Sequence, residues 1–301
     1  MRKFMFLAVL GMAFVLGCGK PPVVNPPTPP ADPPVPVVQT DDRAVLVGIN
    51  DYPGAPLEGC INDVLNIQDY LIVNEKFPAD KIIVLLDAEA TTVDILDKLK
   101  WLVKDAKAGD RRYFHFSGHG TEYAGRNLDI QPDKLNQLIC PFDFNWTEKN
   151  MILDVDFVDI FKVMPAGVLF NWASDSCHSG DLTREFKKPG TKPRQYPHIP
   201  EAVQEQLRKA KIANVKSKGL VNGILDVGYV SGCRYDQTSA DTTEGGKPCG
   251  AMTYFFVKVL KEKKGVPLGE VVKVLNMQLA ASGYEQRPQC EGARAGKQFL
   301  K

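Results

Sequence analysis

Residues 113–120 read YFHFSGHG, and residues 168–180 read VLFNWASDSCHSG. In each stretch a short apolar run ends in small and polar residues. Such runs are typical of strands buried on both faces of a parallel sheet, and ligands of these sheets bind beyond the carboxyl ends of the strands. His119 and Cys177 are therefore both expected at that edge. Because a thiol nucleophile needs a base within hydrogen-bond reach, this pair is the candidate catalytic pair.

Strands and helices alternate along the chain beyond residue 42. The predicted strands are Arg43–Gly48, Lys81–Leu86, Tyr113–Phe116, Val168–Trp172 and Gly228–Gly232, and the predicted helices are Gly59–Val73, Thr92–Lys104, Asp154–Val163, Glu201–Ala213, Ala251–Lys261 and Leu268–Ala281. Residues 117–144 are expected to be rich in loops. This order predicts an α/β fold with a mostly parallel central sheet and helices on both faces.

The N-terminal segment has the pattern of an export signal. Arg2 and Lys3 precede an apolar run, Phe4–Leu16, which is shorter than the about 20 residues that span a bilayer. Val15–Cys18 resembles a bacterial lipobox, which implies a signal peptide over residues 1–17 and diacylation of Cys18. The alternative is an ordinary secretory signal with an incidental cysteine, which would give a secreted protein. On the first interpretation the protein is exported and anchored to a membrane of the bacterial cell envelope.

Composition sets further limits. Residues 18–40 contain nine prolines and predict an extended membrane-proximal linker; a Pro-rich partner motif is the alternative. The remaining residues, 41–301, suffice for one large α/β domain.

The chain holds 37 Lys and Arg against 36 Asp and Glu, which does not suggest nucleic acid as a partner. Seven cysteines lack C-x-x-C spacing, so we expect few or no structural disulfides.

The motifs together resemble those of the metacaspases, caspase-like cysteine peptidases of family C14. SGHG at 117–120 and DSCHSG at 175–180 are similar to the family's catalytic motifs. The other similar stretches, in family order, are residues 47–52, 57–63, 141–144, 231–233, 236–241, 250–254 and 284–289. The resemblance implies a caspase-like three-layer sandwich with a large portion (41–183), an intersubunit-like loop (184–222) and a small portion (223–301).

The resemblance also implies an activity, cleavage of protein or peptide substrates after Arg or Lys by a monomeric enzyme. Cys177 would attack the scissile carbonyl, His119 would move the proton, and the backbone N–H groups of Cys177 and Gly120 would hold the oxyanion. The residues that correspond to the family's substrate pocket are Cys60, Asp63, Ser117 and Asp175. Its two carboxylates suit a guanidinium and disfavour an acidic side chain.

Calcium is implied less completely. Metacaspases commonly bind it through an acidic cluster, and the candidate ligands here are Asp133, Asp154, Asp156 and Asp181. Val155 stands where the family has one acid of a pair, and Arg184 stands at a later acidic position. Because Ca²⁺ takes six or more oxygen ligands, the predicted ligand set is incomplete.

Residues 184–218 carry ten basic residues and four prolines. Composition alone predicts a solvated loop. If the pocket binds Arg or Lys, the same loop is also a tethered substrate for autoprocessing. Three alternatives remain at this point: a catalytically silent caspase-like scaffold, a clostripain-like or gingipain-like protease of the same clan, and a binding lipoprotein without turnover.

Overall fold

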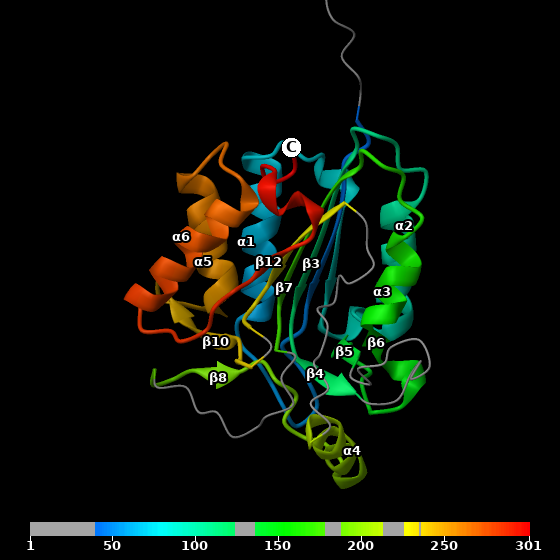
Figure 1. The fold of residues 1–301 in the computed structure, drawn as a ribbon, viewed down its shortest axis with the longest axis vertical. Helices are drawn as coiled ribbons and strands as arrows, with labels where there is room; N and C mark the ends of the chain where they lie inside the picture. Colours follow the sequence, from blue (N-terminus) through cyan, green and yellow to red (C-terminus); the bar gives the residue numbers. More distant parts are fainter. Residues whose placement is uncertain (1–39, 124–135, 178–187, 213–225, 235) are drawn as a thin grey trace, which may run out of the picture. The chain divides into compact units, whose positions relative to one another are not determined.

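Six strands form the central sheet, in the order β12-β9-β7-β3-β1-β2 (Figure 1). This computed structural model describes residues 40–123, 136–177, 188–212, 226–234 and 236–301. All neighbouring strands are parallel except β12, which runs antiparallel to β9. The strands are β1 (Arg43–Gly48), β2 (Ile82–Leu86), β3 (Arg111–Ser117), β7 (Leu169–Asp175), β9 (Val227–Ser231) and β12 (Cys290–Glu291).

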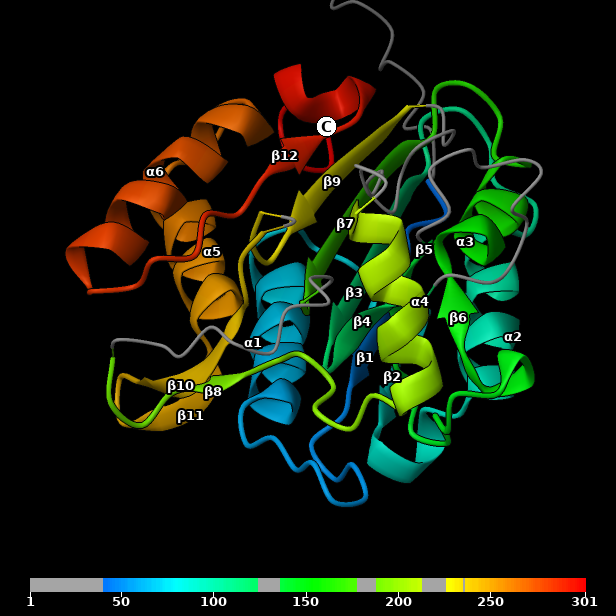
Figure 2. The same cartoon turned by 60° about the horizontal axis from the view of Figure 1, so that its bottom comes forward.

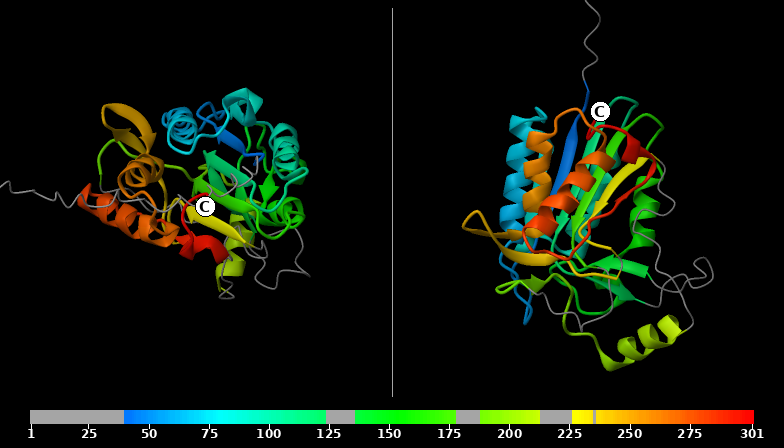
Figure 3. Two further views of the ribbon diagram at one scale, coloured as in Figure 1. Left: turned by 90° about the horizontal axis from the view of Figure 1, so that it is seen from above. Right: turned by 60° about the vertical axis from the view of Figure 1, so that its left-hand side comes forward.

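Helices cover both faces of this sheet, which confirms the predicted α/β class. On one face lie α1 (Cys60–Val73), α5 (Ala251–Glu262) and α6 (Leu268–Ala281); on the other lie α2 (Thr92–Val103) and α3 (Asp154–Phe161) (Figures 1 and 3). The remaining α-helix, α4 (Glu201–Ile212), lies beyond the carboxyl ends of the parallel strands (Figure 2).

Alternate residues of each central strand feed two separate cores. In β1, Val45 and Val47 pack with the α2 and α3 side, whereas Ala44 and Leu46 pack with the side of α1, α5 and α6. Successive side chains of a strand point to opposite faces. A strand covered on both faces therefore reads as a continuous apolar run, which is why the sequence predicts these strands well.

Two small antiparallel sheets were not predicted. One comprises β4 (Gly120–Tyr123), β5 (Asn136–Ile139) and β6 (Ile152–Leu153), and its first two strands lie within residues 117–144, which were expected to be rich in loops. The other comprises β8 (Lys192–Pro193), β10 (Ala240–Glu244) and β11 (Lys247–Gly250). The expectation of loops is wrong for β4 and β5. Each of these strands has four residues, too few to show either a continuous apolar run or a clear alternation of apolar and polar residues.

The predicted signal peptide, the proline-rich linker and Cys18 lie outside the described residues. Within the described part of the chain, every helix is too short or too polar to cross a bilayer.

Candidate active site

The sheet places the two catalytic candidates at neighbouring strand ends. Strands β3 and β7 pair in parallel, with Ser117 opposite Asp175 as the last pair. His119 follows the first strand and Cys177 follows the second, each two residues beyond this pair. Both side chains are buried. The fold therefore brings to one edge two residues that are far apart in the sequence.

The hydrogen bonds of His119 assign its tautomer. Its Nε2 atom lies 2.8 Å from the carbonyl oxygen of Ala55, and a carbonyl can only accept, so Nε2 carries the hydrogen. Nδ1 then has a free lone pair, and it makes no hydrogen bond within the described structure. Burial lowers the pKa of His119 to about 4, against the smaller upward effects of the Ala55 and Arg194 backbone carbonyl groups. The imidazole is therefore neutral near pH 7 and can accept a proton at Nδ1.

Two backbone donors converge on one oxygen atom beside this pair. The carbonyl oxygen of Arg194 accepts hydrogen bonds from the backbone N–H of Gly120 at 3.0 Å and of Cys177 at 3.3 Å. Next to it, the N–H of Ser239 donates to the Cys177 sulfur at 2.7 Å. Convergent N–H groups of this kind stabilise the oxyanion that forms when a thiol attacks a carbonyl. The Arg194 carbonyl oxygen is thus held by both backbone donors beside the Cys177 sulfur.

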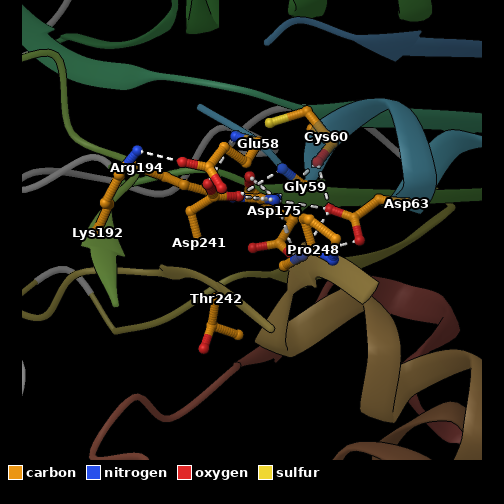
Figure 4. Close-up of polar contacts among 12 residues, drawn as sticks. Glu58, Gly59, Cys60, Asp63, Asp175, Lys192, Arg194, Asp241, Thr242 and Pro248 are labelled. Carbon is orange, nitrogen blue, oxygen red and sulfur yellow. Dashed lines mark hydrogen bonds and ion pairs between the residues drawn. The ribbon is translucent and has the colours of Figure 1, made fainter. Parts of the chain in front are cut away.

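The side chain of Arg194 fills an acidic pocket (Figure 4). Its Nη2 atom lies 2.8 Å from Asp63 Oδ2 and 2.9 Å from Asp241 Oδ1. Its Nη1 atom lies 2.6 Å from Ser117 Oγ and 3.3 Å from Asp175 Oδ2. The side chain has no exposed surface. Three carboxylates and a hydroxyl thus surround one guanidinium.

Each carboxylate is held in place by groups other than Arg194. Asp63 accepts from the N–H of Gly250 at 2.9 Å and from Ser117 Oγ at 2.7 Å. Asp175 accepts from the N–H and hydroxyl of Thr253, while Asp241 accepts the backbone N–H groups of residues 58 and 59. These bonds orient the acids before a cation arrives.

A glycine forms one wall of the pocket. A Cβ atom on Gly250 would lie 2.2 Å from Asp175 Oδ2 and 2.4 Å from Arg194 Nη1. Both distances are shorter than a carbon atom tolerates. The absence of a side chain at residue 250 is therefore what admits the guanidinium.

The pocket is built for a cation. Burial raises the pKa of Asp63 to about 7, even though the Arg194 guanidinium opposes this shift. The Arg194 pKa in turn lies well above its usual value, because its neighbouring acids outweigh the effect of burial. Cys60 is also buried at this site, and burial raises its thiol pKa against the opposing charge of Arg194. A neutral or acidic side chain would leave the buried carboxylates uncompensated.

The residues flanking Arg194 lie extended across the site. Lys192 and Pro193 form β8, which pairs antiparallel with β10, and the N–H of Arg194 donates to the Ser239 carbonyl at 3.0 Å. On the other side, the N–H of Tyr196 donates to the Gly120 carbonyl at 3.1 Å. Composition predicted a solvated loop here, and that is wrong at Arg194 and Gln195, which are 0% and 2% exposed.

Sequence reasoning placed Cys60, Asp63, Ser117 and Asp175 in this pocket, and the structure brings all four around Arg194. It missed Asp241, which belongs to a motif that had been noted without a role. It also missed the Ala55 carbonyl, because a backbone group leaves no trace in the sequence.

Of the four calcium candidates, the structure describes two. Asp154 and Asp156 begin α3, where Asp154 Oδ1 accepts from the N–H of Val155 and Asp156 Oδ2 accepts from the N–H of Leu153. Both of these bonds are made at the N-terminus of the helix. Among the described residues, no group of three or more His, Cys, Asp or Glu side chains is arranged to hold a metal ion. Asp133 and Asp181 lie outside the described residues.

Comparisons with known proteins agree on one family. The family profile "Metacaspase, peptidase C14 domain" matches residues 42–184. Metacaspase-1 of Candida albicans is 32% identical over 82% of this chain and 64% of its own, and that of Scheffersomyces stipitis is 32% identical over 82% and 69%. The chain thus spans about two thirds of the length of these relatives.

The fold has a match among solved structures as well. A crystal structure of a Geobacter sulfurreducens protein superposes with a TM-score of 0.61 over 86% of this chain and 96% of that chain, at 22% identity. At this identity the match supports the fold alone. The family profile and the similarity to the two metacaspases show that the chain belongs to the metacaspase family, peptidase family C14.

Proposed function

We propose that the protein is a cysteine endopeptidase that cleaves peptide bonds after Arg or Lys. The observation that carries this proposal is the position of Arg194. Its side chain meets three buried carboxylates, while its carbonyl oxygen meets the N–H groups of Gly120 and Cys177. A substrate with a basic residue before the scissile bond would make the same contacts.

The chemistry follows from the placement of these groups. The neutral His119 takes the thiol proton at Nδ1, and the Cys177 sulfur attacks the carbonyl carbon. The two convergent N–H groups hold the oxyanion. His119 then gives its proton to the leaving amine, and water hydrolyses the acyl-enzyme. The Ala55 carbonyl orients the imidazole, the role that a carboxylate has in serine proteases.

A matched set of peptides tests this proposal. We expect the chain to hydrolyse fluorogenic peptides that end in Arg or Lys and to leave the Asp-ended and Gln-ended analogues intact. Equal or preferred cleavage of the Asp-ended peptide would contradict the proposed specificity. Absence of both self-cleavage and hydrolysis of any peptide would favour the catalytically silent scaffold.

The chain also holds a substrate of its own. Because Arg194 already occupies the pocket, we propose that the first bond cleaved is Arg194–Gln195, within the loop where autoprocessing was expected. Until then the segment blocks the pocket against other substrates. Cleavage separates the fragment with His119 and Cys177 from one that begins at Gln195.

Substitution of Arg194 tests the cleavage position. We expect Arg194→Ala to abolish formation of the fragment that begins at Gln195. Arg194→Lys should still form this fragment, but more slowly, because lysine reaches the acids as a single point charge. Intact mass spectrometry of the full chain over time gives the fragment masses. The control is Arg208→Ala, since Arg208 is exposed on α4 and pairs with Glu205. Unchanged cleavage in Arg194→Ala would place the cut elsewhere.

The pocket predicts a pH dependence. Burial raises the pKa of Asp63 to about 7 with the Arg194 guanidinium beside it, and departure of that guanidinium would raise the pKa further. Protonation of Asp63 as the pH falls removes one of the charges that bind the substrate. We therefore expect kcat/KM for an Arg-ended peptide to fall by up to about tenfold per pH unit below this pKa. Asp63→Asn should lower kcat/KM and remove this acidic limb. If the decrease of kcat/KM at low pH persists unchanged in Asp63→Asn, the decrease arises from the titration of another group.

Two further properties rest on sequence and resemblance alone. We propose that a lipid on Cys18 anchors the protein to the bacterial cell envelope, which fatty-acid labelling of the chain and of Cys18→Ala would test. We also propose that calcium raises the activity, which hydrolysis rates in calcium and in chelator would test.

A further inference from the structure

A second cysteine lies beside the proposed nucleophile. Strands β7 and β9 pair in parallel, and Ser174 lies opposite Ser231 in their last pair. Cys177 follows the first of these serines by three residues, and Cys233 follows the second by two. Neighbouring strands lie about 4.8 Å apart, within the range of Cα separations that a disulfide spans.

The pairing of β7 with β9 places the two thiols near each other. The nearby Cys177 thiol and burial together raise the pKa of the Cys233 thiol well above its usual value. The Cys233 Sγ atom also lies 3.1 Å from the carbonyl oxygen of Gln237. Both cysteines are buried free thiols. The peptidase mechanism has no use for a second thiol at this position.

We propose that Cys177 and Cys233 form a reversible disulfide when a hydroperoxide oxidises the enzyme. The Cys177 thiolate attacks the peroxide O–O bond, which yields a sulfenic acid and a molecule of water or alcohol. The Cys233 sulfur then attacks the sulfenic sulfur; the S–S bond forms, and the oxygen leaves as water with the thiol proton. Two thiols are oxidised by two electrons and one peroxide is reduced.

The consequence for activity rests on the proposed function. A sulfur in a disulfide cannot attack a carbonyl, so the oxidised enzyme is inactive. A dithiol reductant restores both thiols by exchange. The disulfide also keeps Cys177 from further oxidation to the sulfinic acid, which is irreversible for most proteins. Cys233 would thus make inactivation reversible.

Mass spectrometry of the full chain tests the bond itself. The protein is treated with hydrogen peroxide, its remaining thiols are alkylated, and it is digested with trypsin without reduction. We expect residues 163–184 and 219–234, the tryptic peptides that carry Cys177 and Cys233, to be linked. Dithiothreitol should separate them. Absence of the linked pair after complete oxidation would overturn the proposal.

Activity on an Arg-ended peptide tests the consequence. After peroxide, the wild-type chain should lose at least about nine tenths of its activity and regain most of it in dithiothreitol. Cys233→Ser should lose it without recovery, and Cys233→Ala provides the same test if the serine variant does not fold. The matched control, Cys290→Ser, should behave as wild type.

The failures of the two proposals are distinguishable. A linked pair with unchanged activity would support the disulfide and remove Cys177 from its role as nucleophile. Full recovery of peroxide-treated Cys233→Ser would overturn the protective role of Cys233.

Discussion

Cys177→Ala is expected to abolish peptide hydrolysis and self-cleavage together, with a loss of at least ~10³-fold in kcat, because the sulfur that forms the acyl-enzyme is removed. The backbone of residue 177 still donates its N–H in this variant, so the loss isolates the contribution of the sulfur. Rates on an Arg-ended peptide and intact mass over time measure both activities. The variant should remain folded, since alanine fits where a buried thiol was.

Cys140→Ala is the matched control. Cys140 is also buried, and burial raises its pKa well above the usual value, but its thiol has no part in the mechanism. Its substitution should leave the rates within about twofold of wild type. Residual self-cleavage of Cys177→Ala at Arg194 would show that another nucleophile, such as Cys60 in the same pocket, performs the reaction.

Asp241→Asn is expected to lower kcat/KM for Arg-ended peptides by about 10²–10³-fold, the range that follows from breaking a buried ion pair. Asp241 Oδ1 lies 2.9 Å from Arg194 Nη2, and the side chain is 2% exposed. Asparagine keeps an oxygen for one of the two backbone N–H groups that Asp241 accepts, those of residues 58 and 59. The change therefore removes one charge and one hydrogen-bond acceptor.

Parallel rates on Arg-ended and Gln-ended peptides separate charge from damage. In Asp241→Asn, the rate on the Arg-ended peptide should fall, and the rate on the Gln-ended peptide should stay near background. The control is Asp236→Asn, because Asp236 is partly exposed and pairs with Arg234 outside the pocket. If Asp241→Asn cleaves the Arg-ended peptide at the wild-type rate, the specificity resides in Asp63 and Asp175 alone.

The sequence predicted the five parallel strands of the central sheet because they are covered on both faces, and it missed the two-residue antiparallel strand β12. Residues such as Val45 and Leu46 pack into opposite cores, so the strand reads as an unbroken apolar run. The small sheets escaped detection for the opposite reason. Strand β10, with sequence ADTTE, is polar at four of its five positions and is defined by its partners β8 and β11.

The candidate site likewise contains residues that the sequence predicted and residues that it missed. His119 and Cys177 stand out because small residues follow a buried strand at both places. Asp241 does not, since an acid in a polar strand looks like any exposed acid until the fold places it against Gly59 and Arg194. Arg194 is one of ten basic residues between residues 184 and 218, and composition does not indicate which of them binds in the pocket. Pairing of β8 with β10 selects which of them enters the pocket.

Covalent labelling tests the central claim most directly. A peptide chloromethyl ketone that ends in arginine combines the cation that the pocket should bind with an electrophile that the nucleophile should attack. We predict that it alkylates Cys177, found as a modified tryptic peptide 163–184 in the self-cleaved chain, and that the aspartyl analogue leaves that peptide unmodified. Equal labelling by the aspartyl reagent, or labelling of Cys60 in place of Cys177, would contradict the assignment of nucleophile and pocket.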